Sequence, residues 1–237
     1  MKGGTAYSKR IRKLFNKLKR ESSVPPVPEA ENLVEHLILG VLSADASDTR
    51  AKTALRRIKE GTVDLNDFRV TPPRDIAEII GKGYPDVVQK AGQLSRFLNA
   101  IFEREHRLDL SFLEDKGKRE AREYLETVAN PYVAAWAILW GIGGHAIPVD
   151  EQLLAVLEKD ELIDPEASVE EVQSFLERNI SASDAQEFVL LIRKHTASKA
   201  PRSKSKVTKG VIAGKTSEGM SRGKKCKAAV RKEASHS

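Results

Sequence analysis

Asp150 is the residue best placed for chemistry: it ends a glycine-rich break, GIGGHAIPVD, and opens the predicted helix EQLLAVLEK. A carboxylate there can cap the helix, or it can stabilise positive charge that develops on a bound substrate. Tyr132 begins the apolar run before the break and could act beside Asp150 or simply pack. His145 lies within the break, and a loop histidine is more often structural. The order of turn, apolar helix, break and aspartate suggests a scaffold that grips a nucleic-acid backbone and directs one carboxylate at the gripped site.

The charge of the chain is strongly segregated. The 237 residues carry a net charge of +6, of which residues 1–20 supply +8 and residues 198–237 supply +10, which leaves −12 for residues 21–197. Basic ends on an acidic body predict a polyanion partner that is contacted through the ends. The plainer alternative is a solubilising tail and a solvated helix.

Several classes of protein are excluded by composition. No segment approaches the ~20 apolar residues of a membrane span, and the N-terminus has no apolar signal core. The one cysteine, Cys226, cannot form an intramolecular disulfide or a four-cysteine iron–sulfur cluster within one chain. No pattern resembles a metal site. We therefore expect a monomer of the cytoplasm, associated with the nucleoid, that holds no metal or cofactor.

The hydrophobic periodicity predicts an all-α protein. Residues 1–28 are expected to form a basic N-terminal helix followed by a proline-rich linker, and residues 29–197 a helical domain on which that helix packs. The helices are expected near residues 32–43, 48–59, 74–80, 85–105, 120–127, 133–140, 151–158, 169–178 and 184–194. Residues 198–237 are rich in Lys, Ser and Ala and contain no aromatic residue, so we predict a disordered tail.

Four segments of the chain occur in the order found in a known family. They read EHLILGVLSADASDT, IIGKGYPDVVQKAGQL, PVDEQLLAVL and LLIRKHTASKAPR. Through them the chain, from about Lys13 to Arg202, resembles the endonuclease III-like DNA glycosylases, the helix-hairpin-helix (HhH-GPD) family. The resemblance implies two helical subdomains with a cleft between them, double-stranded DNA as the partner, and extrusion of the target nucleotide into the cleft.

The resemblance also implies roles for particular residues. Asp150 matches the aspartate that stabilises positive charge on the sugar while the base leaves. Tyr132, eighteen residues earlier, stands where bifunctional members have a lysine, so a Schiff-base lyase is not expected; a mismatch-specific thymine glycosylase branch works with tyrosine there. The phosphate-binding hairpin falls at Val128, Ala129 and Asn130, where valine resists the left-handed conformation that the family's glycines allow.

Other family positions have also changed. Asp45 stands where the family has the glutamine that fills the gap left by the extruded base. The cluster cysteines correspond to Ala197 and Ser203, so the resemblance implies a branch without the iron–sulfur cluster. Lys90, a helix-surface residue by its pattern, falls near the DNA-facing cleft. The remaining DNA-binding candidates are basic residues at the start of the tail: Lys199, Arg202, Lys204 and Lys206.

Three functions remain open at this point. The first is a monofunctional DNA N-glycosylase in base-excision repair that uses Asp150 and perhaps Tyr132. The second is a related DNA-binding protein without catalysis, held on DNA by its basic ends. The third is a protein-interaction module whose acidic body binds a basic partner while its tail binds nucleic acid.

Overall fold

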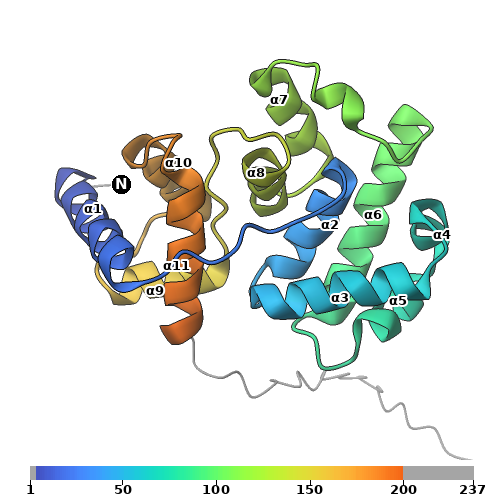
Figure 1. Ribbon diagram of the computed structural model, residues 1–237, viewed down its shortest axis with the longest axis horizontal. Coiled ribbons are helices and arrows are strands. Elements are labelled where there is room, and N and C mark those ends of the chain that lie inside the picture. Colours follow the sequence, from blue (N-terminus) through green and yellow to red (C-terminus); the bar gives the residue numbers. More distant parts are fainter. Residues whose placement is uncertain (1–3, 200–237) are drawn as a thin grey trace, which may run out of the picture. The chain divides into compact units, whose positions relative to one another are not determined.

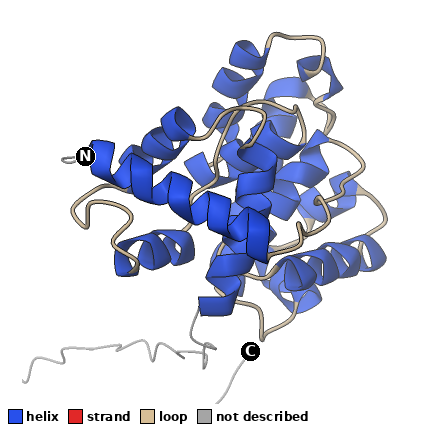
Figure 2. Ribbon diagram, turned by 60° about the vertical axis from the view of Figure 1, so that its left-hand side comes forward, coloured by secondary structure: helices blue, strands red, loops and turns tan. Residues whose placement is uncertain are grey.

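The computed structural model describes residues 4–199, and within this range the chain is entirely helical, with loops between the helices (Figures 1 and 2). The elements are α1 (Gly4–Glu21), α2 (Leu33–Ser43), α3 (Asp48–Gly61), α4 (Leu65–Val70), α5 (Pro73–Ile80), α6 (Val87–Glu105), the 3-10 helix η1 (Ser111–Leu113), α7 (Lys118–Val128), α8 (Pro131–Trp140), α9 (Glu151–Lys159), α10 (Val169–Asn179) and α11 (Ala185–Lys199). The prediction of an all-α fold is confirmed.

The centre of the fold is the pair α2 and α8. Every residue of α2 is buried, and so is every residue of α8 after Pro131. The two helices pack closely because Gly40 has no side chain: a Cβ there would lie 3.2 Å from the Trp136 ring. Apolar side chains on all sides of both helices explain their burial. His36 of α2 and Trp140 of α8 are each only 8% exposed.

The remaining helices form two groups around this pair (Figure 1). Helices α3 to α7 pack on one another and on α2 and α8, whereas α1, α9, α10 and α11 pack together on the other side. The linker after α1 crosses α11, where Lys194 Nζ donates to the Ser23 carbonyl oxygen at 3.0 Å. The linker thereby returns the chain from the second group to α2.

Most helix bounds agree with the sequence pattern, and the differences have local causes. Helix α4 was not predicted, because six residues are too few to establish a hydrophobic period; Asp64 caps it by accepting from Asp67 N at 2.7 Å. Helix α11 continues to Lys199, two residues into the segment that we expected to be a disordered tail. Among the described residues, no helix combines the length and the apolar character that a membrane crossing requires.

Candidate functional site

Asp150 is the N-cap of α9, and both of its carboxylate oxygens accept backbone hydrogen bonds. Oδ1 accepts from Leu153 N at 2.8 Å and Oδ2 accepts from Asp45 N at 3.2 Å. The side chain is only 10% exposed. The capping role, which the sequence left as an alternative, is therefore present in the structure.

Arg193 of α11 is the cation of this site. Its guanidinium donates to Asp48 Oδ1 at 2.8 Å and to the Tyr132 hydroxyl at 2.8 Å, and its Nη1 lies 3.7 Å from Asp150 Oδ2. It also donates to the carbonyl oxygens of Ser43 and Ala46 at 3.1 and 3.2 Å. A buried guanidinium requires partners of this kind, since an unpaired buried charge is strongly unfavourable.

Tyr132 is enclosed by the same network. Its hydroxyl accepts from Arg193 and lies 3.2 Å from Ser43 Oγ, and the residue is 7% exposed. Burial raises the pKa of Tyr132 above its usual value. The phenol therefore stays protonated at neutral pH and is engaged with neighbouring side chains.

Asp45 is directed at α9. Its backbone is left-handed, with φ of 51°, and its Oδ1 accepts from Gln152 N at 3.1 Å. Its carbonyl oxygen accepts from the Gln152 side chain at 2.9 Å. Burial, followed by the proximity of Asp150, raises the pKa of Asp45. This carboxylate thus shares with Asp150 the capping of the first turn of α9.

Lys90 requires a correction, because we expected it on the helix surface. It is 5% exposed, and its ammonium donates to the carbonyl oxygen of Ala44 and, at 3.5 Å, to that of Leu42. Burial lowers the pKa of Lys90 to about 8, although Asp45 and other nearby carboxylates favour the charged form. Lys90 therefore stabilises the C-terminal end of α2 and is buried instead of lying on the helix surface.

The turn between α7 and α8 has a different backbone from the one that we considered. Val128 ends α7, and Ala129 and Asn130 are extended, with φ of −132° and −69°, so no residue of the turn is left-handed. Asn130 Oδ1 accepts from Val133 N at 2.8 Å, while Pro131 has no N–H. Of the first three positions of α8, Tyr132 alone retains an uncommitted N–H for an incoming phosphate.

A small pocket borders Asp150. It has a volume of about 210 Å³ and is lined by Pro25 of the linker, Asp48, Asp150 and Arg193, among others. The carboxylates of Asp48 and Asp150 and the guanidinium of Arg193 thus line one pocket. The Arg193 guanidinium occupies the space between them.

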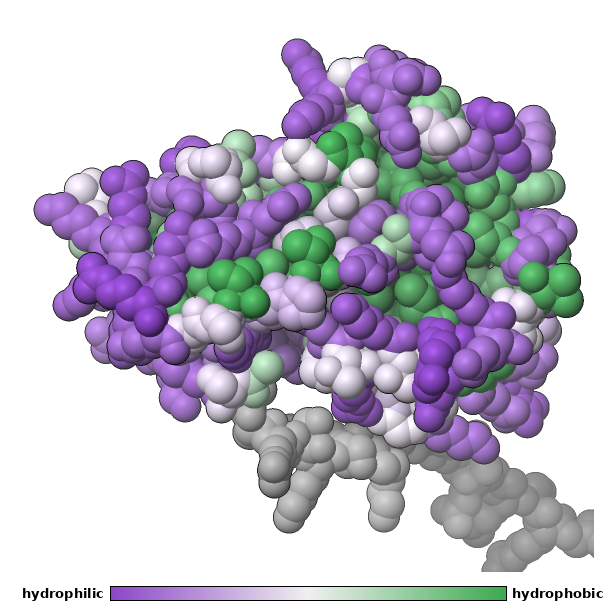
Figure 3. All heavy atoms as spheres, in the orientation of Figure 1, coloured by the Kyte–Doolittle hydropathy of each residue, from purple (hydrophilic) through white to green (hydrophobic). Residues whose placement is uncertain are grey.

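The outer face of α1 carries four exposed cations without partners. Lys9, Arg12, Lys13 and Arg20 lie opposite the buried residues of α1 and have no ion-pair or hydrogen-bond partner among residues 4–199. In Figure 3 the end of the molecule over α1, at the left, is strongly hydrophilic. We call these four residues the α1 stripe. Lys199, in contrast, is paired with Asp160. Arg202, Lys204 and Lys206 lie outside the described residues.

Sequence reasoning did not identify Arg193, Asp48 or Ser43. The only sequence signal for Arg193 is an arginine that interrupts the apolar run of α11. Its partners come from α2, α3 and α8, and no spacing in the sequence indicates that these meet. The His145 prediction is consistent with the structure, since its Nε2 lies 3.0 Å from the Ile180 carbonyl oxygen. Among residues 4–199, no cluster of His, Cys, Asp or Glu could hold a metal ion.

The fold of the chain is that of the helix-hairpin-helix DNA glycosylases. A complex of endonuclease III with DNA has 18% identity and a TM-score of 0.62, over 78% of this chain and 84% of that one. A thermostable thymine-DNA glycosylase has 16% identity and a TM-score of 0.59, over 84% and 90%. H. pylori 3-methyladenine DNA glycosylase bound to 1,N6-ethenoadenine has 16% identity and a TM-score of 0.59, over 84% and 99%.

At these identities the likeness establishes the fold alone. No protein-family model matches the sequence, and no curated protein matches it either. The resemblance inferred from the four sequence segments is therefore confirmed at the level of the fold, and the chemistry has to be argued from the residues of this chain.

Proposed function

We propose that this protein binds double-stranded DNA on a DNA glycosylase fold and that its Asp150 site does not excise bases. Of the functions that the sequence left open, this is the DNA-binding protein without catalysis. The observation that carries it is the position of Arg193 beside Asp150.

A glycosylase aspartate works by its negative charge, which stabilises the positive charge that develops on the sugar. Here a guanidinium lies 3.7 Å from Asp150 Oδ2 and is hydrogen-bonded to the Asp48 carboxylate and the Tyr132 hydroxyl. Its charge offsets the field of Asp150 in a poorly solvated site, where electrostatic interactions are strong. Both carboxylate oxygens are also occupied by backbone N–H groups. These contacts support a structural role for Asp150.

DNA binding is supported by the fold and by the α1 stripe. The solved structures that share the fold include complexes with DNA. Lys9 and Arg20 are separated by eleven residues, so the α1 stripe extends over roughly 16 Å at 1.5 Å per residue. Exposed cations without partners contribute to binding by neutralising phosphates and releasing counterions. Because residues 21–197 are acidic overall, the α1 stripe is the surface of the described chain that we expect to contact the negatively charged duplex.

One observation favours the alternative function, a monofunctional glycosylase. Asp150 does line a pocket, of about 210 Å³, and a movement of Arg193 would enlarge it. Release of a base by the native chain, abolished by Asp150→Asn, would support this reading.

The proposal is tested by the salt dependence of binding to a fluorescent duplex, measured by anisotropy. Replacing all four residues of the α1 stripe by glutamine is expected to weaken binding and to make the negative slope of log K against log [salt] shallower by about two to four units. The matched control removes four exposed cations that also have no partner among residues 4–199, with Lys52, Arg74, Lys159 and Arg178 replaced by glutamine, and should change the slope by less than about one unit. Equal effects of the two variants would contradict the role given to α1, and absence of binding by the native chain would overturn the proposal.

A further inference from the structure

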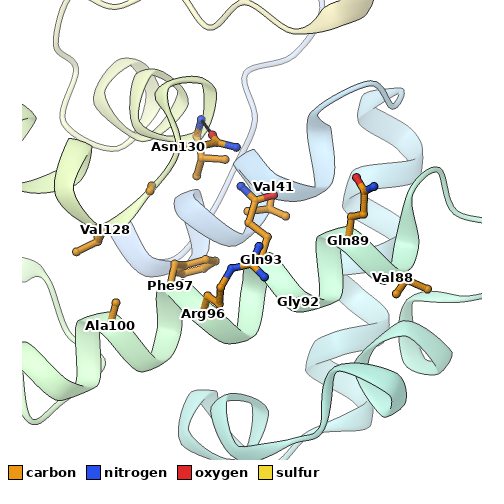
Figure 4. Close-up of a pocket in the computed structure, with 12 residues that line it drawn as sticks. Val41, Val88, Gln89, Gly92, Gln93, Arg96, Phe97, Ala100, Val128 and Asn130 are labelled. Carbon is orange, nitrogen blue, oxygen red and sulfur yellow. Dashed lines mark hydrogen bonds between the residues drawn. The ribbon is translucent and has the colours of Figure 1, made fainter.

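Two pockets outside the Asp150 network differ in the charge of their linings. The larger, of about 580 Å³, lies between α6, α2 and the α7–α8 turn, and its lining contains a single charged residue, Arg96 of α6 (Figure 4). The smaller, of about 310 Å³, lies between α3 and the loop after α5. Its lining contains Arg50 and Arg57 and neither Asp nor Glu, so we call it the two-arginine pocket. In a body with a net charge of −12, this pocket is a local cationic site.

Both arginines of the two-arginine pocket are held against the loop after α5 without a carboxylate partner. Arg57 Nη1 donates to the Ile80 carbonyl oxygen at 2.8 Å, and Arg50 Nη2 donates to the Gly83 carbonyl oxygen. Neither guanidinium forms an ion pair with any of residues 4–199. A guanidinium has five N–H donors, so most of the donors of both side chains remain available to a ligand.

The turn at residues 81–84 adds further donors beside these arginines. Gly81 has φ of 108°, which favours glycine, and a Cβ there would lie 2.7 Å from Arg57 Nη1. The missing side chain thus allows Arg57 to lie across the turn. Tyr84 N closes the turn by donating to the Gly81 carbonyl oxygen at 2.9 Å, whereas the N–H groups of Lys82 and Gly83 have no acceptor in the described part of the chain. Unpaired N–H groups of a turn and guanidiniums are the donors that anion sites use.

We propose that the two-arginine pocket binds a phosphate monoester, the terminal phosphate of a small molecule. Two guanidiniums without a carboxylate in the lining match a dianion, and a phosphate monoester carries nearly two negative charges at neutral pH. A phosphodiester of the DNA backbone carries only one. The planar guanidinium also binds two phosphate oxygens at once, which favours phosphate over a spherical anion. The pocket lies in the helix group that does not contain the α1 stripe, so this inference is independent of the proposed function.

The test compares methyl phosphate with dimethyl phosphate, which differ by one methyl group and one charge. Each is titrated near pH 7, at constant ionic strength, into the full chain labelled with ¹⁵N, and the amide signals of Lys82 and Gly83 are followed by NMR. Methyl phosphate is expected to shift both signals until they saturate, with a dissociation constant of about 1 mM. Dimethyl phosphate should bind at least about fivefold more weakly, because it has lost one charge.

Substitutions separate the pocket from a general effect of charge. Arg57→Gln and Arg50→Gln should each weaken the binding of methyl phosphate about tenfold. Lys52→Gln is the matched control, since it removes an exposed cation without a partner among residues 4–199 from the same helix, outside the pocket, and should change the affinity less than about twofold. The remaining amide signals verify that each variant is folded; if Arg57→Gln unfolds, Arg50→Gln compared with Lys52→Gln decides.

Three results overturn this inference: no saturable shift with methyl phosphate, equal affinity for dimethyl phosphate, or an equal loss of affinity in Lys52→Gln. None of them bears on the binding of DNA through the α1 stripe, which the salt dependence tests separately.

Discussion

The sequence resemblance matches Asp150 to a catalytic carboxylate, but its contacts are those of a helix cap. Leu153 N and Asp45 N take both oxygens, and Arg193 balances the charge. The glycosylase interpretation depends on a carboxylate that faces an open groove. With an exposed fraction of 10%, the side chain of Asp150 faces mainly the protein.

The capping role predicts a difference between two substitutions. Asp150→Ala removes the acceptor for Leu153 N and should lower the free energy of unfolding by about 1–2 kcal/mol. Asp150→Asn keeps an oxygen acceptor at the cap and should cost less than the alanine variant. Urea denaturation measures both, with Ser168→Ala, at the N-cap of α10, as a reference for a cap without a buried cation. A gain in stability in Asp150→Asn would instead indicate a carboxylate held in place for function.

Lys90 provides a test that depends on pH. Burial lowers its pKa to about 8 from the ordinary value of 10.5, so between these values the unfolded chain binds more protons than the folded one. Stability therefore rises with pH across this window, and the penalty for burying the charge is complete below about pH 8.

The measurement is the free energy of unfolding of the native chain relative to Lys90→Met, at pH 7 and pH 10. The comparison cancels the titration of other groups. From pH 7 to pH 10, the free energy of unfolding of the native chain should rise by about 2–3 kcal/mol relative to that of the variant. A difference that does not vary with pH would show that the ammonium of Lys90 is solvated in the folded protein.

At the scale of the elements, sequence predicted the helices that have a clear period and capping residues. Asn32 and Ser168 both cap the helices that were expected after them. Helix α4 was missed because it is too short to show a period. The α7–α8 turn lies where the sequence placed it. Ala129 and Asn130 connect the helices with extended backbone, and the left-handed conformation that valine resists is not used.

The candidate site was less predictable than the helices. Asp150, Tyr132 and Asp45 were named from the resemblance, and the structure does bring them together. The charge balance of this site depends on Arg193. Its partners Asp48 and Tyr132 are 145 and 61 residues away in the sequence. A single sequence has no local signal for such contacts. The pocket between α6, α2 and the α7–α8 turn, which Gly92 and Asn130 line, was not predicted for the same reason. It forms only when α6 and α8 pack on α2.

At the scale of the whole molecule, basic and acidic residues are segregated along the chain. The body is acidic, and within residues 4–199 the unpartnered cations of α1 lie on a single face of that helix. The fold places two features near α2 and α6: the hydrogen-bonded network around Asp150, and a larger pocket of about 580 Å³ whose lining includes Gln89 and Gln93. On the proposed function, such a protein keeps the fold of a DNA glycosylase and binds DNA without using the aspartate for catalysis.

Single-turnover base release distinguishes a structural Asp150 from a catalytic one. The native chain, in excess over duplexes that carry uracil, a G·T mismatch, 8-oxoguanine or 1,N6-ethenoadenine, is first shown by anisotropy to be bound. Liberated bases are then separated by chromatography. We predict no release above the rate without protein, for the native chain and Asp150→Asn alike. If the native chain releases any of these bases and Asp150→Asn abolishes that release, Asp150 is catalytic and the proposed function is wrong.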